Sequence, residues 1–392
     1  MKRIAFFEPV WKGNAHLVAN AGLIRIAHAA STDSEKFYIG DVQQFKLIRD
    51  MHTSTETGEL GYIAWNAESD PDTLPLHAWK FRNKLTRVAA GVLRTSDMIV
   101  LTSCSANSLT AITSMGHAHK TVAVLHGNAN ELTGWRSRNP LRRLFDMKAS
   151  LQRFCRHGGT VIVLEERIKK GLSQQFPWMA RNIQCLPHAL AAEEGSHANA
   201  PKPFSYPIKI GFAGLATNAK GFPEFLQLAE ALKKRRSDAF EFHAIGKLHP
   251  ECLNLDQSAL TTRAGTQTLD RKAFIEALKE LNYLFLWHKD YYYTNAASGV
   301  LYDAINLGIP VIAKKGAQIS EWEATGQPIG SSHSGIDDVI EWLDSISAET
   351  EGNNYQLQRQ NQSHLRESLG IPNLSKKFFE IKKQIQARTS RS

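Results

Sequence analysis

The hydrophobic residues fall in short continuous runs of β-branched and aromatic side chains, separated by longer stretches of helical character. Nine such runs are spaced along the chain, at 4–7, 98–102, 121–126, 160–164, 183–187, 208–213, 240–245, 283–287 and 311–313. Continuous rather than alternating apolar runs are typical of strands buried on both faces, and hence of parallel sheets covered by helices. Helices between successive strands give βαβ units. The pattern therefore predicts an α/β protein.

The helical periodicity is clearest at 222–236. Its apolar residues share one stripe, Pro223 suits a first turn, and four basic residues at 233–236 complement the carboxyl end of the helix dipole. The segment 193–207 is rich in Ala, Ser and Pro and has no periodicity, which is typical of a linker. We therefore expect one domain over 1–192, a second over 208–370, and a C-terminal helix within 371–392 that can cross back to the first domain.

Composition narrows the class of protein. The 392 residues are 42% hydrophobic and 22% charged, an ordinary globular balance. No apolar run approaches the ~20 residues of a spanning helix, and the apolar stretch near the start is too short for a secretion signal, so we expect a cytoplasmic protein. The four cysteines are far apart and form no CxxC pair, so we expect them to be reduced and buried, with no zinc or disulfide scaffold.

The net charge of +9 is unevenly distributed. Residues 1–200 hold 24 Lys and Arg against 17 Asp and Glu, and the segment 135–157 alone carries +6. Five apolar residues of this segment can share a stripe, namely Leu141, Leu144, Phe145, Leu151 and Cys155. Four arginines then face outward, namely Arg142, Arg143, Arg153 and Arg156. This arrangement suits an interfacial helix on an anionic membrane surface; a core-facing helix with a solvated basic face is the alternative.

The turn after the run at 208–213 has the composition of a phosphate-binding turn. In GFAGLATNAKGF, residues 211–222, a buried strand leads through glycines to Lys220-Gly221 and the start of the predicted helix. Backbone N–H groups at a helix start, together with one ammonium, are suited to bind a diphosphate. The stretch is not a P-loop, because no Ser or Thr follows the lysine to hold magnesium. An ordinary turn with a solvated lysine is the alternative.

A second stretch, TNAASGVLYDAINLGIPVIA at 294–313, places another helix start before a strand. Ser298-Gly299 would begin this helix, Gly308 would end it, and Pro310 leads into the run at 311–313. Asp303 would lie on its first turns, where its carboxylate could accept hydrogen bonds from a ribose. A surface carboxylate without such a role is the alternative.

In this order and about 80 residues apart, the two stretches resemble the nucleotide-sugar half of GT-B-fold glycosyltransferases, and the family-4-type group most of all. Lys220 matches the lysine of that group's strand-GxLxxxKG turn, and Gly308 and Pro310 match its closing A-x-x-x-G-x-P-V-I run. The resemblance implies two Rossmann-like domains facing a central cleft. It also implies a UDP- or GDP-type sugar donor, no cofactor and no metal, since fixed cations and N–H groups neutralise the leaving diphosphate.

The chain departs from the group's pattern at three positions. Leu215 stands at its arginine, and Asn295 and Asp303 stand at its two glutamates. Ser298-Gly299 also resembles the donor loop of glucuronosyl- and other exopolysaccharide transferases, which leaves the subfamily, the sugar and the stereochemical course open. The donor-binding residues implied by the resemblance are Gly13, Gly214, Thr217, Lys220, Gly246, Ser298, Gly299 and Asp303.

Candidate catalytic residues follow two strands of the N-terminal half. His16 ends the stretch EPVWKGNAH, where similar enzymes place a glycine loop that faces the donor phosphates and the acceptor. His126 ends a buried run and is expected to point into the cleft, where similar enzymes contact the transferred sugar. Glu131 would be the general base of an inverting reaction. The alternatives are a capping or packing role for His16 and a surface charge for Glu131.

Two further motifs contribute little to the assignment of a function. Pro187-His188 resembles the step with which the family ends its first domain, and it supports the domain boundary. Asp70-Pro71-Asp72 has the spacing of the metal-binding Asp-x-Asp of the other glycosyltransferase fold. It lies in a polar loop with no strand before it, so no metal site is predicted.

The sequence thus predicts a hexosyl- or glycuronosyltransferase of surface polysaccharide or glycan synthesis, acting on a saccharide or lipid-linked saccharide at the cytoplasmic membrane face. A nucleotide-sugar 2-epimerase of the same fold is the first alternative, for which only His126, Glu131 and His288 supply titratable groups. A basic nucleic-acid-binding protein is the second; it would need aromatic residues interleaved with the charge or a recognition helix, and the strand-rich pattern contains no such module. We therefore expect no nucleic-acid partner.

Overall fold

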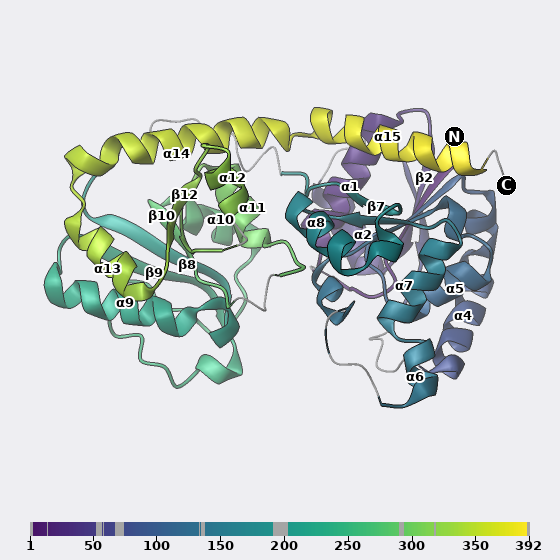
Figure 1. Ribbon diagram of the computed structural model, residues 1–392, viewed down its shortest axis with the longest axis horizontal. Helices are drawn as coiled ribbons and strands as arrows, with labels where there is room; N and C mark the ends of the chain where they lie inside the picture. Colours follow the sequence, from purple (N-terminus) through teal and green to yellow (C-terminus); the bar gives the residue numbers. More distant parts are fainter. Residues whose placement is uncertain are drawn as a thin grey trace. The chain divides into compact units, whose positions relative to one another are not determined.

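The computed structural model describes residues 3–13, 15–51, 57, 59–66, 74–132, 134, 138–190, 203–289, 294–316 and 319–389 (Figure 1). Its contacts divide the chain into two compact units. The first comprises Met1–Ala189, Asn295–Ala297 and Leu369–Ser392, and the second comprises Leu190–Thr294 and Ser298–Ser368. Asp70-Pro71-Asp72 and most of the expected linker lie outside the described residues.

The first unit is built on a seven-stranded sheet in the order β3-β2-β1-β4-β5-β6-β7, and its strand pairs are parallel. The strands are β1 (Arg3–Phe7), β2 (Glu35–Gly40), β3 (Leu60–Ala64), β4 (Met98–Leu101), β5 (Thr121–Val124), β6 (Thr160–Val163) and β7 (Ile183–Cys185). The strand order reverses between β1 and β4. In parallel sheets, ligands bind at the carboxyl ends of the strands at such a reversal.

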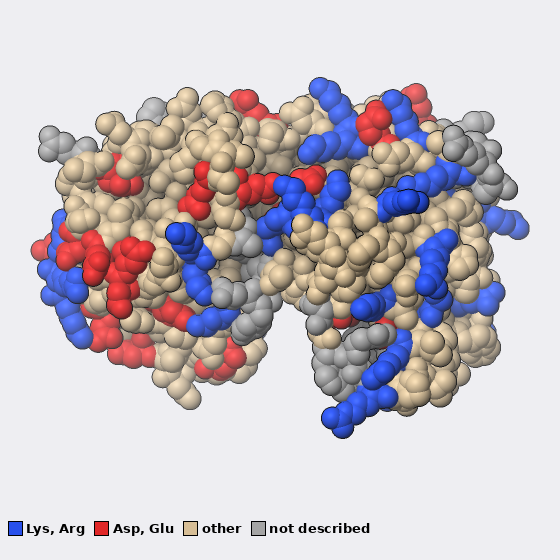
Figure 2. All heavy atoms as spheres, in the orientation of Figure 1, with Lys and Arg blue, Asp and Glu red and all other residues tan. Residues whose placement is uncertain are grey.

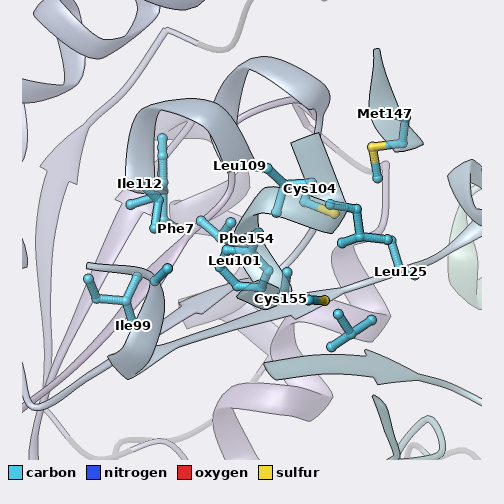
Figure 3. Close-up of a cluster of buried hydrophobic side chains, with 14 of the residues drawn as sticks. Phe7, Ile99, Leu101, Cys104, Leu109, Ile112, Leu125, Met147, Phe154 and Cys155 are labelled. Atoms are coloured by element: carbon cyan, nitrogen blue, oxygen red, sulfur yellow. The ribbon is translucent and has the colours of Figure 1, made fainter. Parts of the chain in front are cut away.

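Helices cover both faces of this sheet. They are α1 (Leu17–Ala30), α2 (Val42–Met51), α4 (Pro75–Thr95), α5 (Ala106–Ser114), α6 (Pro140–Leu144), α7 (Met147–Arg156), α8 (Glu166–Gln175) and α15 (Ile371–Thr389). Adjacent residues of β1 serve opposite faces. Phe7 packs with α4, α5 and α7 in the cluster drawn in Figure 3, whereas Phe6 packs in a second cluster with α1 and α15. Burial on both faces accounts for the continuous apolar runs.

The second unit is built on a five-stranded parallel sheet in the order β12-β11-β10-β8-β9. Its strands are β8 (Ile208–Ala216), β9 (Phe240–Leu248), β10 (Tyr283–Leu286), β11 (Val311–Lys314) and β12 (Gly330–His333). Its helices are α9 (Phe222–Arg235), α10 (Arg271–Lys279), α11 (Gly299–Leu307), α12 (Ser320–Ala324), α13 (Ile336–Ser345) and α14 (Ala348–Ser368). Here the strand order reverses between β8 and β10, which places the turn after β8 at the reversal.

All nine predicted runs contain strands, and the prediction of two Rossmann-like α/β domains is confirmed. Three strands were not predicted, namely β2, β3 and β12. The polar stretch after residue 345 contains the 21-residue helix α14, which was not predicted either. The expected C-terminal helix forms as α15, and its buried residues Leu374, Phe378 and Ile381 pack in the cluster that contains α1.

The basic segment 135–157 differs from its prediction. It forms two helices, not one, because Asp146 begins a new helix by accepting a hydrogen bond from the Ala149 N–H at 2.8 Å. Leu151 and Cys155 are buried in α7, but Leu141 and Leu144 of α6 are 58% and 54% exposed. The outward placement of Arg153 was wrong. Its guanidinium donates to the Leu144 carbonyl at the end of α6 and lies 5.3 Å from the Phe145 ring centroid.

Surface charge differs between the units. On the face seen in Figure 2, basic side chains predominate over the region of α4 to α7, whereas both signs are mixed on the second unit. The four cysteines are free and buried, and burial raises the pKa of Cys155 and Cys185 to about 12. Among the described residues, no helix is long and apolar enough to cross a membrane.

Candidate functional site

Three histidine rings lie in a tilted series, called here the histidine stack, at the carboxyl edge of the first sheet. His16 precedes α1, His126 follows β5 and His188 follows β7; the ring centroids of His16 and His126 are 4.3 Å apart, and those of His126 and His188 are 5.8 Å apart. The Trp11 indole covers the other side of His16 at 4.8 Å. The structure thus brings the predicted His16 and His126 together. It adds His188, which the sequence analysis had used only as a boundary marker.

The stack is uncharged at neutral pH. Burial, reinforced by the neighbouring histidines, lowers the pKa of His16 to about 3, and burial, reinforced by the neighbouring His126, lowers the pKa of His188 to about 3. Burial also lowers the pKa of His126, which the Thr102 carbonyl and the charge of Glu8 partly oppose. Neutral imidazoles can each donate one hydrogen bond and accept another, as recognition of a hydroxyl group requires.

The tautomer of His126 follows from its contact. Its Nε2 lies 2.8 Å from the Thr102 carbonyl oxygen, and a carbonyl can only accept, so Nε2 carries the proton. Nδ1 of the neutral ring therefore holds the lone pair. His126 can accept a hydrogen bond or a proton only through Nδ1.

His16 has an unusual backbone. Its φ of 56° is left-handed, and it is the only described non-glycine residue with a positive φ. Such conformations cost about 1–3 kcal/mol and persist where the surroundings impose them, often at functional sites. Its Nδ1 is buried and has no hydrogen-bond partner among the described residues. His16 begins α1 but makes no side-chain cap, so a capping role does not explain it.

The loop before α1 is held by side chains from the turn after β2 and from α2. The Gly13 N–H donates to Asp41 Oδ1 at 3.1 Å, and Gly13 has a φ of 55°. Gln44 Nε2 donates to the carbonyls of Gly13 and Ala15, at 3.2 and 2.6 Å. Gly13 therefore occupies a fixed turn, and because its N–H is used by Asp41, its contact with a donor phosphate stays a prediction.

Other candidate residues of the first unit lie near its edge. Glu131 is exposed in the 3₁₀ turn η2 (Gly127–Leu132). The adjacent Asn130 accepts a hydrogen bond through Oδ1 from the Asn295 N–H at 3.2 Å. Asn295, which stands where the resembled group has a glutamate, is buried, and its Nδ2 has no partner among the described residues.

The turn after β8 gathers the predicted donor residues of the second unit. A Cβ built on Gly214, whose φ is 91°, would lie 3.7 Å from Lys220 Nζ and 3.4 Å from Val300 Cγ2 in the first turn of α11. A Cβ on Gly246 would lie 2.1 Å from the Gly214 carbonyl oxygen, so this approach of β9 to β8 requires glycine. Thr217 accepts the Lys220 N–H through Oγ1 at 3.1 Å and fixes the turn.

Lys220 is a cation with no counter-charge among the described residues. In the part of the chain that the structure describes, its ammonium makes no hydrogen bond or ion pair, and burial lowers its pKa. A buried ammonium without a counter-charge is energetically unfavourable until an anion binds beside it. Ser298, fully buried, begins α11 and accepts the Leu301 N–H through Oγ at 3.4 Å. Gly299 is the next residue in the chain, and its N–H group lies in the first turn of α11.

Asp303 has a partner that the sequence analysis missed. Arg271 at the start of α10 makes two parallel hydrogen bonds to its carboxylate, at 2.6 and 3.1 Å. Bidentate pairs of this kind are strong and directional. Arg271 thus anchors α11 to α10, and the role of Asp303 at a ribose stays a prediction. Leu215, at the position of the resembled group's arginine, is partly exposed and supplies no cation.

No metal centre is evident in these edges. Within the described ranges, no group of three or more His, Cys, Asp or Glu side chains is arranged to hold a metal ion. A cavity of about 20 Å³ adjoins His126 and His188, with Asn20 and Thr102 also among its lining residues. A cavity of this size has room for about one water molecule.

Comparison with known proteins identifies the fold. No model of a known protein family matches the chain, and no curated protein matches it. Several solved structures do match the chain. A glycosyltransferase from Rickettsia africae is 14% identical with a TM-score of 0.64, covering 98% of each chain. The Anabaena protein HepE in complex with UDP is 12% identical with a TM-score of 0.62, covering 98% of this chain and 100% of that one.

The UDP-GlcNAc 2-epimerase from Neisseria meningitidis bound to UDP-GlcNAc is also similar. It is 15% identical with a TM-score of 0.57, covering 97% of this chain and 99% of that one. The chain therefore has a GT-B glycosyltransferase-like fold, which glycosyltransferases and UDP-GlcNAc 2-epimerases share.

Proposed function

We propose that the protein is a glycosyltransferase that moves a sugar from a UDP- or GDP-type donor to a saccharide acceptor. The observation that carries the proposal is the Lys220 ammonium, which lies over Gly214 at the strand-order reversal of the second sheet and has no counter-charge among the described residues. A diphosphate would supply that charge. The UDP complex of HepE, which shares the fold, supports a nucleotide as the ligand.

The second unit would stabilise the leaving group. In the transfer, the bond between the anomeric carbon and the β-phosphate oxygen breaks, and the acceptor oxygen bonds to that carbon. The nucleoside diphosphate leaves with the electron pair. Lys220 and the N–H groups at the start of α11 would neutralise the charge that develops.

The first unit would recognise the sugar and accept the acceptor's proton. Among the buried polar atoms there that have no hydrogen-bond partner within the described residues are His16 Nδ1 and Asn295 Nδ2. Buried polar groups are nearly always hydrogen-bonded, and sugar hydroxyls would satisfy both. His126 through Nδ1, Glu131 and His16 are the candidates for the base.

The acceptor would be a lipid-linked saccharide at the cytoplasmic membrane face, within surface polysaccharide or glycan synthesis. The exposed leucines of α6 beside Arg138, Arg142 and Arg143 support this part of the proposal, because apolar and basic side chains together suit an anionic bilayer surface. The attachment would be peripheral.

The test is ligand-dependent stabilisation followed by product analysis. UDP or GDP and one of their sugars should raise the melting temperature, and a ligand at 100 times its Kd adds about 2.7 kcal/mol of stability. Incubation of that sugar with saccharide acceptors should release the free nucleoside diphosphate. If no nucleotide shifts the melting temperature, the proposal is wrong. Conversion of UDP-GlcNAc to its C2 epimer would establish the epimerase alternative, which the Neisseria neighbour favours.

A further inference from the structure

One buried carboxylate lies at the centre of the first unit's site. Glu8 follows β1 and has no exposed surface. Its Oε1 accepts the N–H groups of Val10 and Trp11, both at 3.1 Å, and the Ser103 hydroxyl. Its Oε2 accepts Asn20 Nδ2 at 3.0 Å and the Thr102 hydroxyl at 2.9 Å. Both oxygens are therefore acceptors.

These five donors come from three elements that meet at the strand-order reversal. Val10 and Trp11 belong to the loop after β1, Asn20 to α1, and Thr102 and Ser103 to the turn after β4. Cation partners are not among the contacts made by Glu8 in the described residues. A buried carboxylate of this kind is favourable only while its donors stay in place, since each lost hydrogen bond to a charged group costs about 1.5–3 kcal/mol.

Two histidines of the candidate site, His16 and His126, depend on this arrangement. On one side, Glu8 fixes the Trp11 backbone, and the Trp11 ring packs on His16. On the other side, Glu8 holds the Thr102 hydroxyl, and the carbonyl of the same Thr102 accepts the His126 Nε2 proton at 2.8 Å. Glu8 touches neither imidazole through a hydrogen bond that would make it a catalytic group.

We propose that Glu8 is the positioning residue of this site: it orients His126 through Thr102 and His16 through Trp11, and so sets the geometry in which the histidines meet the sugar. This inference rests on the proposed function for its kinetic consequence. Its structural consequence, the fixed His126 tautomer, does not depend on that function.

The Glu8→Gln variant changes the charge and the hydrogen-bond pattern of this side chain while it keeps the side chain's shape. In Glu8→Gln one oxygen becomes an NH2 group, which would face donors where the carboxylate accepts. We expect kcat for sugar transfer to fall at least 30-fold while the Kd for UDP changes less than threefold, because the Lys220 site lies in the second unit. A loss of histidine alignment acts on the chemical step and not on donor binding.

The control is another buried charged residue of the same sheet. Lys36 in β2 is also buried, and its ammonium donates to the carbonyls of Ser31 and Ser34 at 3.1 and 2.7 Å, before the strand begins. Lys36→Gln should lower stability and leave kcat within threefold of the wild type. An equal fall of kcat in both variants would show that Glu8 acts only through stability and would overturn the proposal.

Two substitutions of Thr102 test whether Glu8 acts on His126 through this residue. Thr102→Val removes the hydroxyl but keeps the carbonyl, and Thr102→Ser keeps both. We expect Thr102→Val to lower kcat and Thr102→Ser to restore most of it. Glu8→Gln combined with Thr102→Val should lower kcat by less than the product of the two single effects, because they break one hydrogen bond. Independent, multiplicative effects would contradict the path through Thr102.

A readout without turnover distinguishes the two proposals. In ¹⁵N-histidine-labelled protein, the His126 Nε2 proton should be visible and slow to exchange in the wild type and Lys36→Gln, and lost in Glu8→Gln. If the wild type transfers no sugar but this pattern holds, the proposed function fails and the positioning role stands. If the Nε2 proton is unchanged in Glu8→Gln, the positioning role fails.

Discussion

The Lys220 ammonium lies 3.7 Å from the point that a Cβ on Gly214 would occupy, so the cation reaches across the turn to the glycine rather than out to solvent. The same point is 3.4 Å from Val300 in the first turn of α11. A turn, a lysine and a helix start are thereby gathered at one edge of the second sheet, and burial lowers the pKa of that lysine. We propose that this arrangement binds an anion.

Removal of this cation should weaken nucleotide binding. Lys220→Ala is expected to reduce the affinity for UDP or GDP by about 1.5–3 kcal/mol, roughly 10- to 150-fold, the range for hydrogen bonds to charged groups. Isothermal calorimetry measures this directly. Lys209→Ala is the matched control, because Lys209 is the second residue of β8 and pairs with Glu280 at 3.4 Å. Equal affinities of wild type and Lys220→Ala would remove Lys220 from the site.

The approach of β9 to β8 predicts a second effect. Gly246→Ala would place a Cβ 2.1 Å from the Gly214 carbonyl oxygen at a φ of 142°, so the end of β8 must shift. We expect a loss of about 2–4 kcal/mol of unfolding free energy, with weaker UDP binding because Gly214 moves. Urea unfolding and calorimetry measure the two effects.

Gly352→Ala in α14 supplies the comparison for this substitution. A Cβ there has nothing within 4 Å, and alanine favours a helix by up to about 1 kcal/mol. The Gly352 variant should therefore match or exceed the wild-type stability. A Gly246→Ala protein as stable as the wild type and equally able to bind UDP would mean that the strand ends adjust without cost.

The sequence predicted the fold through residues whose pattern is local. Buried strands show as apolar runs, and the Lys220 turn shows as glycines before a helix. β12 (GSSH) has no apolar run, and α14 buries amides instead of an apolar stripe; Gln362 donates to the carbonyls of Ile309 and Ile329. Such elements are set by partners distant in the chain, which one sequence does not reveal.

The first unit's site was predictable only in part, for the same reason. His126 was identified because it ends a buried run, but Glu8 looked like an ordinary residue of a loop. Its donors Asn20, Thr102 and Ser103 lie 12 to 95 positions away. Arg271 was not identified for the same reason, because it lies 32 positions from Asp303 in the sequence. The signal that could have found Glu8 is a carboxylate placed directly after a buried strand at the reversal of strand order.

Transfer should continue in EDTA. The proposed neutralisation of the leaving diphosphate uses the Lys220 ammonium and backbone N–H groups, which chelators do not remove. We expect the rate of nucleoside diphosphate release to stay within twofold after dialysis against EDTA. Complete loss with recovery in magnesium or manganese would show that a metal ion carries the charge instead.

Membrane attachment should depend on α6. Leu141→Ser with Leu144→Ser should reduce sedimentation with anionic vesicles at least tenfold. Leu253→Ser in the second unit, where the leucine is 49% exposed, should have no effect.

Replacement of Arg142, Arg143 and Arg156 by Gln should also reduce sedimentation with anionic vesicles, since each basic residue contributes about 1 kcal/mol near an anionic surface. Added salt should weaken the arginine part, because screening acts within about 8 Å. A wild type that stays in the supernatant at low salt would exclude this attachment.

The histidine stack should make stability depend on pH. The folded-state pKa of His16 and of His188 is about 3, against 6.5 for the unfolded chain. Because the folded pKa is the lower one, only the unfolded state gains protons as the pH falls below about 6.5. Stability is therefore complete above that pH and decreases toward pH 3, by roughly 2 kcal/mol for each histidine at pH 5.

Replacement of one histidine isolates its share of this dependence. His188→Gln removes one titrating group from the stack, so its loss of unfolding free energy between pH 7.5 and pH 5 should be smaller than the wild-type loss by roughly 2 kcal/mol. Urea unfolding at the two pH values gives both numbers, and carboxylates common to both proteins cancel in the comparison. His364→Gln is the control, because His364 is exposed on α14 and its replacement should leave the wild-type dependence. If His188→Gln also keeps the wild-type dependence, the imidazole takes up its proton in the folded protein, and the stack is charged where we infer that it is neutral.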